Sequence, residues 1–415
     1  MFLLIFLLFP IFHATAIYGQ PDFFGLAFIF LIISLTIDYD FKELELNRLI
    51  LIFLVTFMLI ISRRWYLYWI ISYYLCYIIK ILITNKKESL GGIIKNLLIY
   101  GLIVLSILLI TLFPLIKNII FGSISNYSEY YKSGGFIYEI KNQINYLGYL
   151  TLGICLLGIG YGLSKKEYRL ITILSIIECF LIIYLFNMIQ SMGLHHSLML
   201  VPTYLYWLYL SIMLLLQIND ISKNRICLAI IACLIINFSY AICNNSTDNF
   251  FSKIPLTVPY QEDYKNLGEV ASWLKENLSN ENNAYMITHN NKYNPDKLRN
   301  YYLPDQSIAN YLPYGSAIIG VHKFPTELFS AKYIIITEPF ESVSIEEKYY
   351  EVFQKLLDQG KFEIEETFDM GNGYKLLIYK RVKKTDDEEK KIYLNALKEE
   401  SEKYPALYKD IIETY

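Results

Sequence analysis

Cysteine is scarce in this chain, and it does not occur in the pattern of a disulfide framework or a metal site. The 415 residues include six cysteines, with no close CxxC pair and no nearby histidine to complete a ligand set. All six lie in or at the edge of apolar segments, as Cys76, Cys155, Cys179, Cys227, Cys233 and Cys243. We interpret them as small hydrophobic side chains, and we expect neither a metal nor a cofactor.

Charge is also sparse through the first part of the chain. Residues 1–243 carry few charged side chains outside short clusters, whereas residues 244–415 hold most of the Asp, Glu and Lys. The formal net charge of −2 gives no reason to expect a nucleic-acid partner. Hydrophobic residues make up 54% of the chain, too many for one soluble globule of this size. We expect a transmembrane domain over 1–245, a soluble domain over 246–383 and a charged helical tail over 384–415.

Long apolar runs predict an α-helical polytopic membrane bundle of about nine spans. A helix needs about 20 apolar residues to cross a hydrocarbon layer of about 30 Å, and the alternation typical of a membrane β-barrel is missing. The expected spans are residues 2–18, 23–37, 49–62, 65–84, 93–114, 146–163, 170–189, 198–218 and 226–243. The second and third are short, so a re-entrant hairpin is an alternative there. The first lacks the basic region and cleavage site of a signal peptide, and we interpret it as a true span.

The basic residues of the short loops predict the orientation, because Lys and Arg resist transfer across the membrane. A cytoplasmic N-terminus leaves ten of them inside: Lys42, Arg48, Lys86, Lys87, Lys95, Lys165, Lys166, Arg169, Lys223 and Arg225. Five then lie outside: Arg63, Arg64, Lys117, Lys132 and Lys141. Nine spans therefore place the soluble domain outside the cell membrane.

On this topology several polar groups face outward at one membrane surface. Arg63 and Arg64 stand together between two apolar runs, followed by Trp65 and Tyr66. One interpretation is that the arginines snorkel to lipid headgroups within an interfacial aromatic belt. The other is that their guanidinium groups bind a phosphate or diphosphate in bidentate fashion.

A histidine pair, His195 and His196, lies where the eighth expected span enters the membrane. Histidine can donate a hydrogen bond to phosphate or shuttle a proton, but the pair can also be merely tolerated at a helix start. Asp22 and Glu129 are the outward carboxylates nearest the membrane, and each is a candidate general base. Asp22 can equally cap the helix that follows it. The loop 121–145 is rich in tyrosine and either contacts sugars or forms an interfacial helix broken at Gly134.

The soluble part is expected to be a small α/β domain. An amphipathic helix of about 18 residues starts near Tyr260, and another helix lies near residues 345–359. Strands are expected at residues 284–288, 316–320, 333–337, 362–368 and 374–380. Asn372-Gly373 predicts a hairpin turn between the last two strands. The tail beyond residue 383 reads as a solvated helix.

Together these features resemble the C-type membrane glycosyltransferases, and among them the protein mannosyltransferase group known as glycosyltransferase family 39. The resemblance rests on the many spans with functional loops outside, the Arg63-Arg64 step, the histidine-rich span start before Pro202, and the exported domain. That domain opens with a stretch from Tyr260 to Lys275 and closes with one from Gly373 to Arg381, both similar to those of bacterial members. The resemblance is architectural and covers most of the chain.

The resemblance implies transfer of a sugar from a polyprenyl-phosphate donor to a glycan or protein acceptor outside the membrane. It implies a catalytic carboxylate in the first outer loop, which here is only Gln20-Pro21-Asp22 and lacks the usual acidic pair. Either Asp22 takes that role or the base lies in a segment preceding Met1. We assign Asp22 and Glu129 to catalysis, Arg63, Arg64, His195 and His196 to the donor phosphate, and Tyr66, Tyr131 and Gln190 to substrate contact.

Two other classes of function remain open from the sequence. A flippase or a polymerase subunit would favour charged residues deep within the spans, where only Lys80 and Glu178 occur. A membrane anchor that displays a binding domain would have no use for the outward polar groups.

Overall fold

The structure is a computed structural model in which two compact units are described separately. The first comprises residues 1–122 and 131–258, and the second comprises residues 123–130 and 259–415. The structure describes residues 8–17, 22–113, 134–218, 223–243, 250–254, 263–290, 292–302, 304–313, 326–342, 344–400, 402, 409–410 and 412–413. The boundary between the units falls at residue 258, about a dozen residues beyond the expected one.

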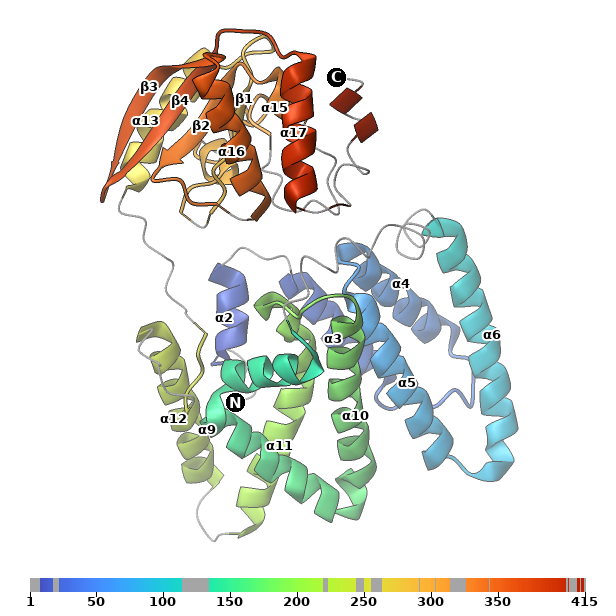
Figure 1. Ribbon diagram of the computed structural model, residues 1–415. Helices are drawn as coiled ribbons and strands as arrows, with labels where there is room; N and C mark the ends of the chain where they lie inside the picture. The colour runs from blue at the N-terminus through green and yellow to red at the C-terminus, as the bar shows by residue number, and fades with distance from the viewer. Residues whose placement is uncertain are drawn as a thin grey trace. The chain divides into compact units, whose positions relative to one another are not determined.

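The first unit is helical (Figure 1). Its elements are α2 (Pro10–Ile17), α3 (Asp22–Thr36), α4 (Leu46–Ser62), α5 (Tyr66–Thr84), α6 (Lys87–Thr111), α9 (Phe136–Ser164), α10 (Lys166–Ile189), the 3-10 helix η1 (Leu194–Leu200), α11 (Val201–Ile218) and α12 (Lys223–Cys243). Among the described residues, five segments are long and apolar enough to cross a membrane, and three more helices are apolar but shorter. The expected number of nine spans is therefore not confirmed, whereas a mostly helical unit with five candidate spans is present among the described residues.

The differences from the expected spans lie at the ends of elements. Only residues 10–17 of the first expected span form a described helix, and residues 1–7 are outside the described part. α3 and α4 have 15 and 17 residues, so each is only about 22 to 26 Å long. α9 begins ten residues before the expected span, because the stretch after Gly135 is helical, as the alternative of an interfacial helix broken at Gly134 predicted for these residues.

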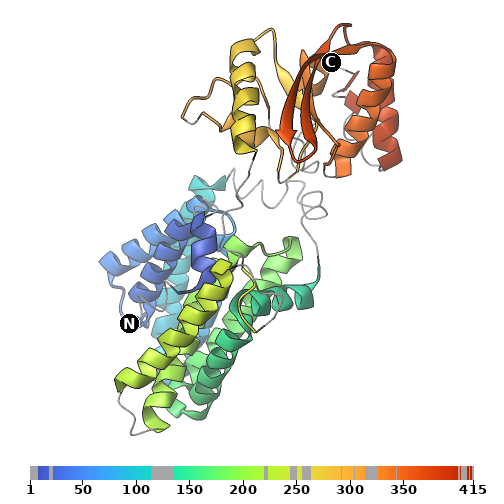
Figure 2. The same ribbon diagram turned by 90° about the vertical axis from the view of Figure 1, so that its left-hand side faces the viewer.

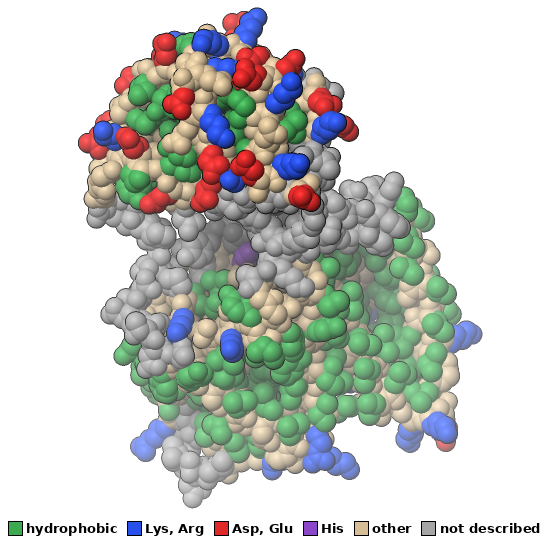
Figure 3. Space-filling view, viewed as in Figure 1, with side chains coloured by type: hydrophobic (Ala, Val, Ile, Leu, Met, Phe, Trp, Pro, Cys, Tyr) green, Lys and Arg blue, Asp and Glu red, His purple; other side chains and the backbone are tan. Residues whose placement is uncertain are grey.

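Consecutive helices return to the same two ends of this unit. α5 and α10 lie antiparallel: the rings of Tyr68 and Phe186 are 5.0 Å apart, and the Cys76 thiol donates to the Leu174 carbonyl at 3.5 Å. The turn 85–86 after α5 therefore lies at the same end as the turn before α10. Lys and Arg side chains follow the lower edge of the unit in Figure 3, where the α5–α6 and α9–α10 turns lie in Figure 1. Apolar side chains cover most of the face above them.

Helix α6 exposes a long apolar surface. Ile93 is its one buried side chain, whereas Leu98, Leu102 and Ile110 are 60%, 63% and 80% exposed. So much apolar surface on one helix is unfavourable in water and favourable in a hydrocarbon layer.

Helix α9 is broken at Gly148, which has a positive φ of 74°. A segment of extended chain enters the break: the Leu150 N–H donates to the Phe250 carbonyl at 3.0 Å, and the Lys253 N–H donates to the Asn145 carbonyl at 2.9 Å. From α12, the Asn237 side chain donates to the Leu147 carbonyl at 3.3 Å and accepts from the Ser252 N–H at 2.8 Å. Backbone groups freed by the break are thus paired, as buried groups in an apolar unit must be.

The second unit is a four-stranded sheet with helices on both faces (Figure 2). The strands are β1 (Ala284–Met286), β2 (Tyr333–Glu338), β3 (Phe362–Gly371) and β4 (Tyr374–Arg381), in the order β1-β2-β4-β3, and only the β1–β2 pair is parallel. The helices are α13 (Tyr264–Asn277), α14 (Pro295–Arg299), α15 (Glu327–Ser330), α16 (Ser344–Asp358) and α17 (Asp387–Glu400). Leu267 and Leu274 of α13 pack with Ile335 on one face, and Val352 of α16 packs with Ile334 on the other.

Most of the expected elements of this unit are present. The exception is the strand expected at residues 316–320, which lies outside the described residues. Asn372 and Gly373 have φ angles of 52° and 80° at the β3–β4 turn, so both adopt the left-handed conformation of a tight hairpin. The tail is part of the domain rather than a solvated appendage, since Tyr393 and Leu397 of α17 are buried in the core. The carboxylate of Glu389 there accepts two hydrogen bonds from Arg381, at 2.9 and 3.0 Å.

A buried carboxyl in α16 predicts a pH dependence of this unit. Glu346 is fully buried and has no hydrogen bond to another described residue, and this burial raises the pKa of its carboxyl to about 8. The folded unit holds the proton more tightly than the unfolded chain, whose pKa is near 4.5. The contribution to stability is therefore present below pH 4.5 and is lost as the pH rises toward 8.

We expect Glu346→Gln to remove this loss and to raise the unfolding temperature most at pH 8. Thermal unfolding of the full chain between pH 5 and pH 8.5 measures the effect. Glu347→Gln, one position along the same helix, is the matched control and should leave the pH profile unchanged. Parallel pH profiles for Glu346→Gln and the parent would contradict the prediction.

Candidate functional site

The candidate site is centred on the start of α3 and the turn between α4 and α5. Asp22 is the first residue of α3 and is 2% exposed. Its Oδ2 lies 3.5 Å from a terminal guanidinium nitrogen of Arg63, which follows the last residue of α4. The hydroxyl of Tyr66, at the start of α5, donates to the backbone carbonyl of Asp22 at 2.8 Å. Three helix ends are therefore joined by polar contacts.

Packing explains why the ends meet. The ring of Tyr66 fills the space beside Gly25, where a Cβ would stand 2.0 Å from the ring. Glycine at this position lets α3 and α5 approach closely enough for the Tyr66 hydroxyl to reach Asp22. Tyr66 itself is 2% exposed, so its hydroxyl serves to position Asp22.

The histidine pair lies beside Arg63. His195 and His196 belong to η1, and their ring centroids are 3.8 Å apart. The charge of Arg63 also acts on both imidazoles. Trp65 and Phe186 contact the ring of His196 at centroid distances of 5.6 and 4.6 Å. Both ring nitrogens of His196 are buried without a hydrogen-bond partner among the described residues, an unusual state for a buried polar group.

A second carboxylate adjoins the same turn. Glu139, in the first turn of α9, is completely buried and interacts with Ser191, Met192 and Asn142. One turn further along α9, Gln143 donates to the Ser197 hydroxyl at 2.9 Å. This links the start of α9 to η1. Residues 190–197 thus interact both with Glu139 and Gln143 of α9 and, through the histidine pair, with the charge of Arg63.

No protein-family model, curated protein or solved structure matches this chain. The site is therefore interpreted from its own geometry. Among the described residues, no group of three His, Cys, Asp or Glu side chains is arranged to hold a metal ion.

The structure separates the two arginines that the sequence places together. Arg63 lies beside Asp22 and the histidines, whereas the exposed Arg64 lies over the ring of Trp65 at 4.2 Å. Gln190 is 4% exposed at the end of α10, and its Oε1 is buried without a hydrogen-bond partner in the described part of the chain. Glu129 and Tyr131 lie outside the described residues, so their assigned roles stay predictions.

Sequence reasoning placed Glu139 in the segment 121–145, read either as a sugar-contacting loop or as an interfacial helix, and gave it no catalytic role. The signal that would have found it is the Gly134-Gly135 pair directly before an apolar run, which is a helix start with a carboxylate in its first turn. Its buried position depends on the packing of α9 against the turn 190–193, which the sequence does not predict.

The arrangement suits a ligand that is anionic at one end and protic at the other. Arg63 and two imidazoles supply donors for an anion. Asp22 and Glu139 supply carboxylates able to accept a proton. The surroundings are apolar, with Trp65 and Phe186 against the imidazole rings, so charge interactions there are stronger than in water.

Proposed function

We propose that this protein is a membrane glycosyltransferase that moves a sugar from a polyprenyl-phosphate donor to an acceptor outside the cell membrane. The observation that carries the proposal is the contact of Asp22 with Arg63 next to His195 and His196. A cation and neutral donors stand beside a carboxylate, where a departing phosphate and an arriving hydroxyl would meet. Lys and Arg gather at the end of the helical unit that holds the α5–α6 and α9–α10 turns (Figure 3). This distribution supports an orientation in which that end is cytoplasmic and the candidate site faces outside.

The proposed reaction is a single inverting displacement. The acceptor hydroxyl oxygen attacks the anomeric carbon as its proton passes to Asp22. The bond between that carbon and the phosphate oxygen breaks, and both electrons leave with the polyprenyl phosphate. Arg63 and the imidazoles stabilise the charge that develops on the phosphate, and this stabilisation is strong in a site partly shielded from water.

The experiment measures transfer of a radiolabelled sugar from a polyprenyl-phosphate donor by the full chain in lipid nanodiscs. We expect Asp22→Asn to reduce turnover by about 10²-fold or more while donor binding is largely kept, because general-base loss acts on the chemical step. Asp40→Asn, at a half-buried residue of the loop after α3 that pairs with Lys42, is the matched control and should retain full turnover. Glu139→Gln should reduce turnover less than Asp22→Asn.

Two outcomes would count against the proposal. Absence of transfer by the parent chain from any polyprenyl-phosphate sugar, with no donor binding, would refute the function. Full turnover by Asp22→Asn together with loss in Glu139→Gln would refute Asp22 as the base.

A further inference from the structure

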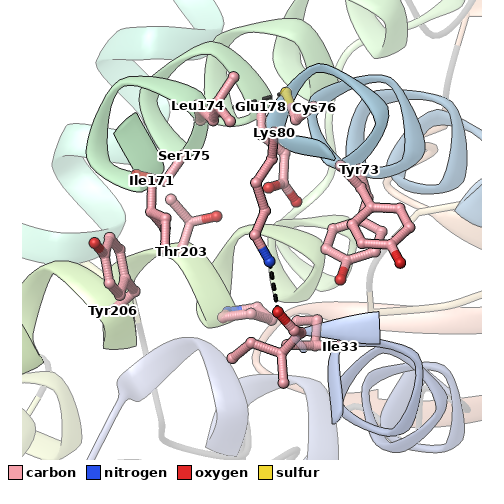
Figure 4. Close-up of a pocket in the computed structure, with 13 residues that line it drawn as sticks. Ile33, Tyr73, Cys76, Lys80, Ile171, Leu174, Ser175, Glu178, Thr203 and Tyr206 are labelled. Carbon is pink, nitrogen blue, oxygen red and sulfur yellow. Dashed lines mark hydrogen bonds between the residues drawn. The ribbon is translucent and has the colours of Figure 1, made fainter. Parts of the chain in front are cut away.

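The helical unit contains a cavity of about 230 Å³ (Figure 4). Neither Asp22 nor Arg63 is among the residues that line it. Side chains of α3, α5, α10 and α11 surround it. Its lining comprises Ile33, Ile37, Tyr73, Cys76, Tyr77, Lys80, Ile171, Leu174, Ser175, Glu178, Pro202, Thr203 and Tyr206. The lining is mostly apolar, with a few polar groups, as in small-molecule sites.

One wall of the cavity is a rigid column of aromatic rings along α5. Trp69 stacks on Tyr73 at 4.6 Å, and Tyr73 stacks on Tyr77 at 6.1 Å. Both tyrosine hydroxyls form hydrogen bonds. The Tyr73 hydroxyl is hydrogen-bonded to the Thr36 hydroxyl, and the Tyr77 hydroxyl donates to the Tyr39 carbonyl. Because their tips are held, the rings present a preformed wall to the cavity.

Two charged side chains enter the cavity, and they do not pair with each other. In Figure 4, Lys80 extends past Glu178 and donates to the backbone carbonyl of Ile37. The charges of Asp38 and Asp40 also act on Lys80, and its Nζ lies 5.9 Å from the centre of the Tyr77 ring. No ion pair of Glu178 occurs among the described residues, and the indole of Trp69 lies beside its carboxyl.

An acidic side chain without an ion pair is unusual at the position of Glu178. It lies near the middle of the 24-residue α10, within a candidate membrane span. A carboxylate at such depth is costly unless it meets a cation or a donor. Tyrosine faces beside it would add attraction for a cation. The cavity thus combines an apolar body, aromatic walls and one acidic group.

We propose that this cavity binds a small hydrophobic amine, with its ammonium group on Glu178 and its apolar body against the Tyr73–Tyr77 wall. The volume is below the range of about 300 to 1,000 Å³ usual for drug-sized ligands, so the ligand is small. This site is independent of the proposed transfer reaction.

The test uses the purified full chain in detergent with 4-phenylbutylamine as the probe. Its neutral counterpart, 4-phenyl-1-butanol, shares the carbon skeleton and lacks the charge. Thermal unfolding at increasing probe concentration gives the apparent Kd, since a ligand of the folded state raises the unfolding temperature. We expect the amine to stabilise the chain and to bind at least about tenfold more tightly than the alcohol.

Three variants sharpen the test. Glu178→Gln keeps the side-chain shape and should remove the preference for the amine, whereas Glu167→Gln, at the exposed start of the same helix, should keep it. Ile171→Trp enlarges a side chain of the lining and should weaken stabilisation by either compound. Equal stabilisation by amine and alcohol, an unchanged preference in Glu178→Gln, or undiminished stabilisation in Ile171→Trp would overturn the proposal.

Discussion

Replacing Arg63 by alanine is expected to weaken binding of a polyprenyl-phosphate sugar by about 100-fold, or roughly 2.7 kcal/mol. The substitution removes the charged donor beside the histidines and leaves Asp22, 2% exposed, without its cation. A buried carboxylate without a partner repels an incoming phosphate. The loss of the cationic donor and the repulsion by Asp22 both weaken donor binding. Binding of a labelled donor to the full chain in nanodiscs measures the loss.

Arg64→Ala is the matched control, because it removes the same side chain at the next position. Arg64 is exposed and lies over Trp65, so we expect donor binding to fall by less than about fivefold, which is near the 1 kcal/mol range of an exposed cation–π contact. Arg63→Lys keeps the charge and loses the planar fork, and an intermediate loss is expected. Equal losses of donor binding in Arg63→Ala and Arg64→Ala would falsify the prediction that only Arg63 binds the donor phosphate.

The second large effect is expected at the break in α9. Gly148→Ala places a Cβ 2.5 Å from the carbonyl carbon of Phe251, and it does so at a φ of 74° that alanine rarely adopts. The inserted chain cannot yield without losing its hydrogen bonds to α9 and Asn237. We expect a loss of about 3 kcal/mol or more in stability, the sum of backbone strain and broken buried hydrogen bonds.

Gly153→Ala is the control in the same helix, because nothing lies within 4 Å of the added Cβ. It should be neutral or slightly stabilising, since alanine restricts the unfolded chain. Thermal unfolding in detergent, followed by size-exclusion of the folded fraction, compares the two variants. Similar unfolding temperatures for the two variants would show that the packing of residues 250–254 against Gly148 does not stabilise the broken helix.

Several elements followed from local sequence alone. The apolar run 65–84 became α5, and the run 170–189 became most of α10, because in a hydrocarbon layer a long apolar segment must satisfy its backbone as a helix. The turn at Asn372-Gly373 was equally predictable, since both residues tolerate a positive φ. The amphipathic spacing of Leu267, Val270 and Leu274 marked the buried face of α13 in the same way.

The candidate site was predictable only in part. Asp22, Arg63, His195 and His196 could be named from the sequence because polar side chains between apolar runs stand out. Residue numbers alone do not show that the two arginines separate. Adjacent side chains leave a turn in different directions, and only the approach of α3 to Tyr66 brings Asp22 to Arg63.

Local composition by itself determined that this chain forms several apolar helices followed by a small α/β domain, because backbone pairing and apolar burial are satisfied over short stretches. Which polar groups meet was decided by tertiary structure. The carboxyl of Glu139 is buried by a turn some 50 residues away, and Gly148 is held by chain about 100 residues later. Such contacts depend on how helices distant in sequence pack, and no local pattern encodes that packing.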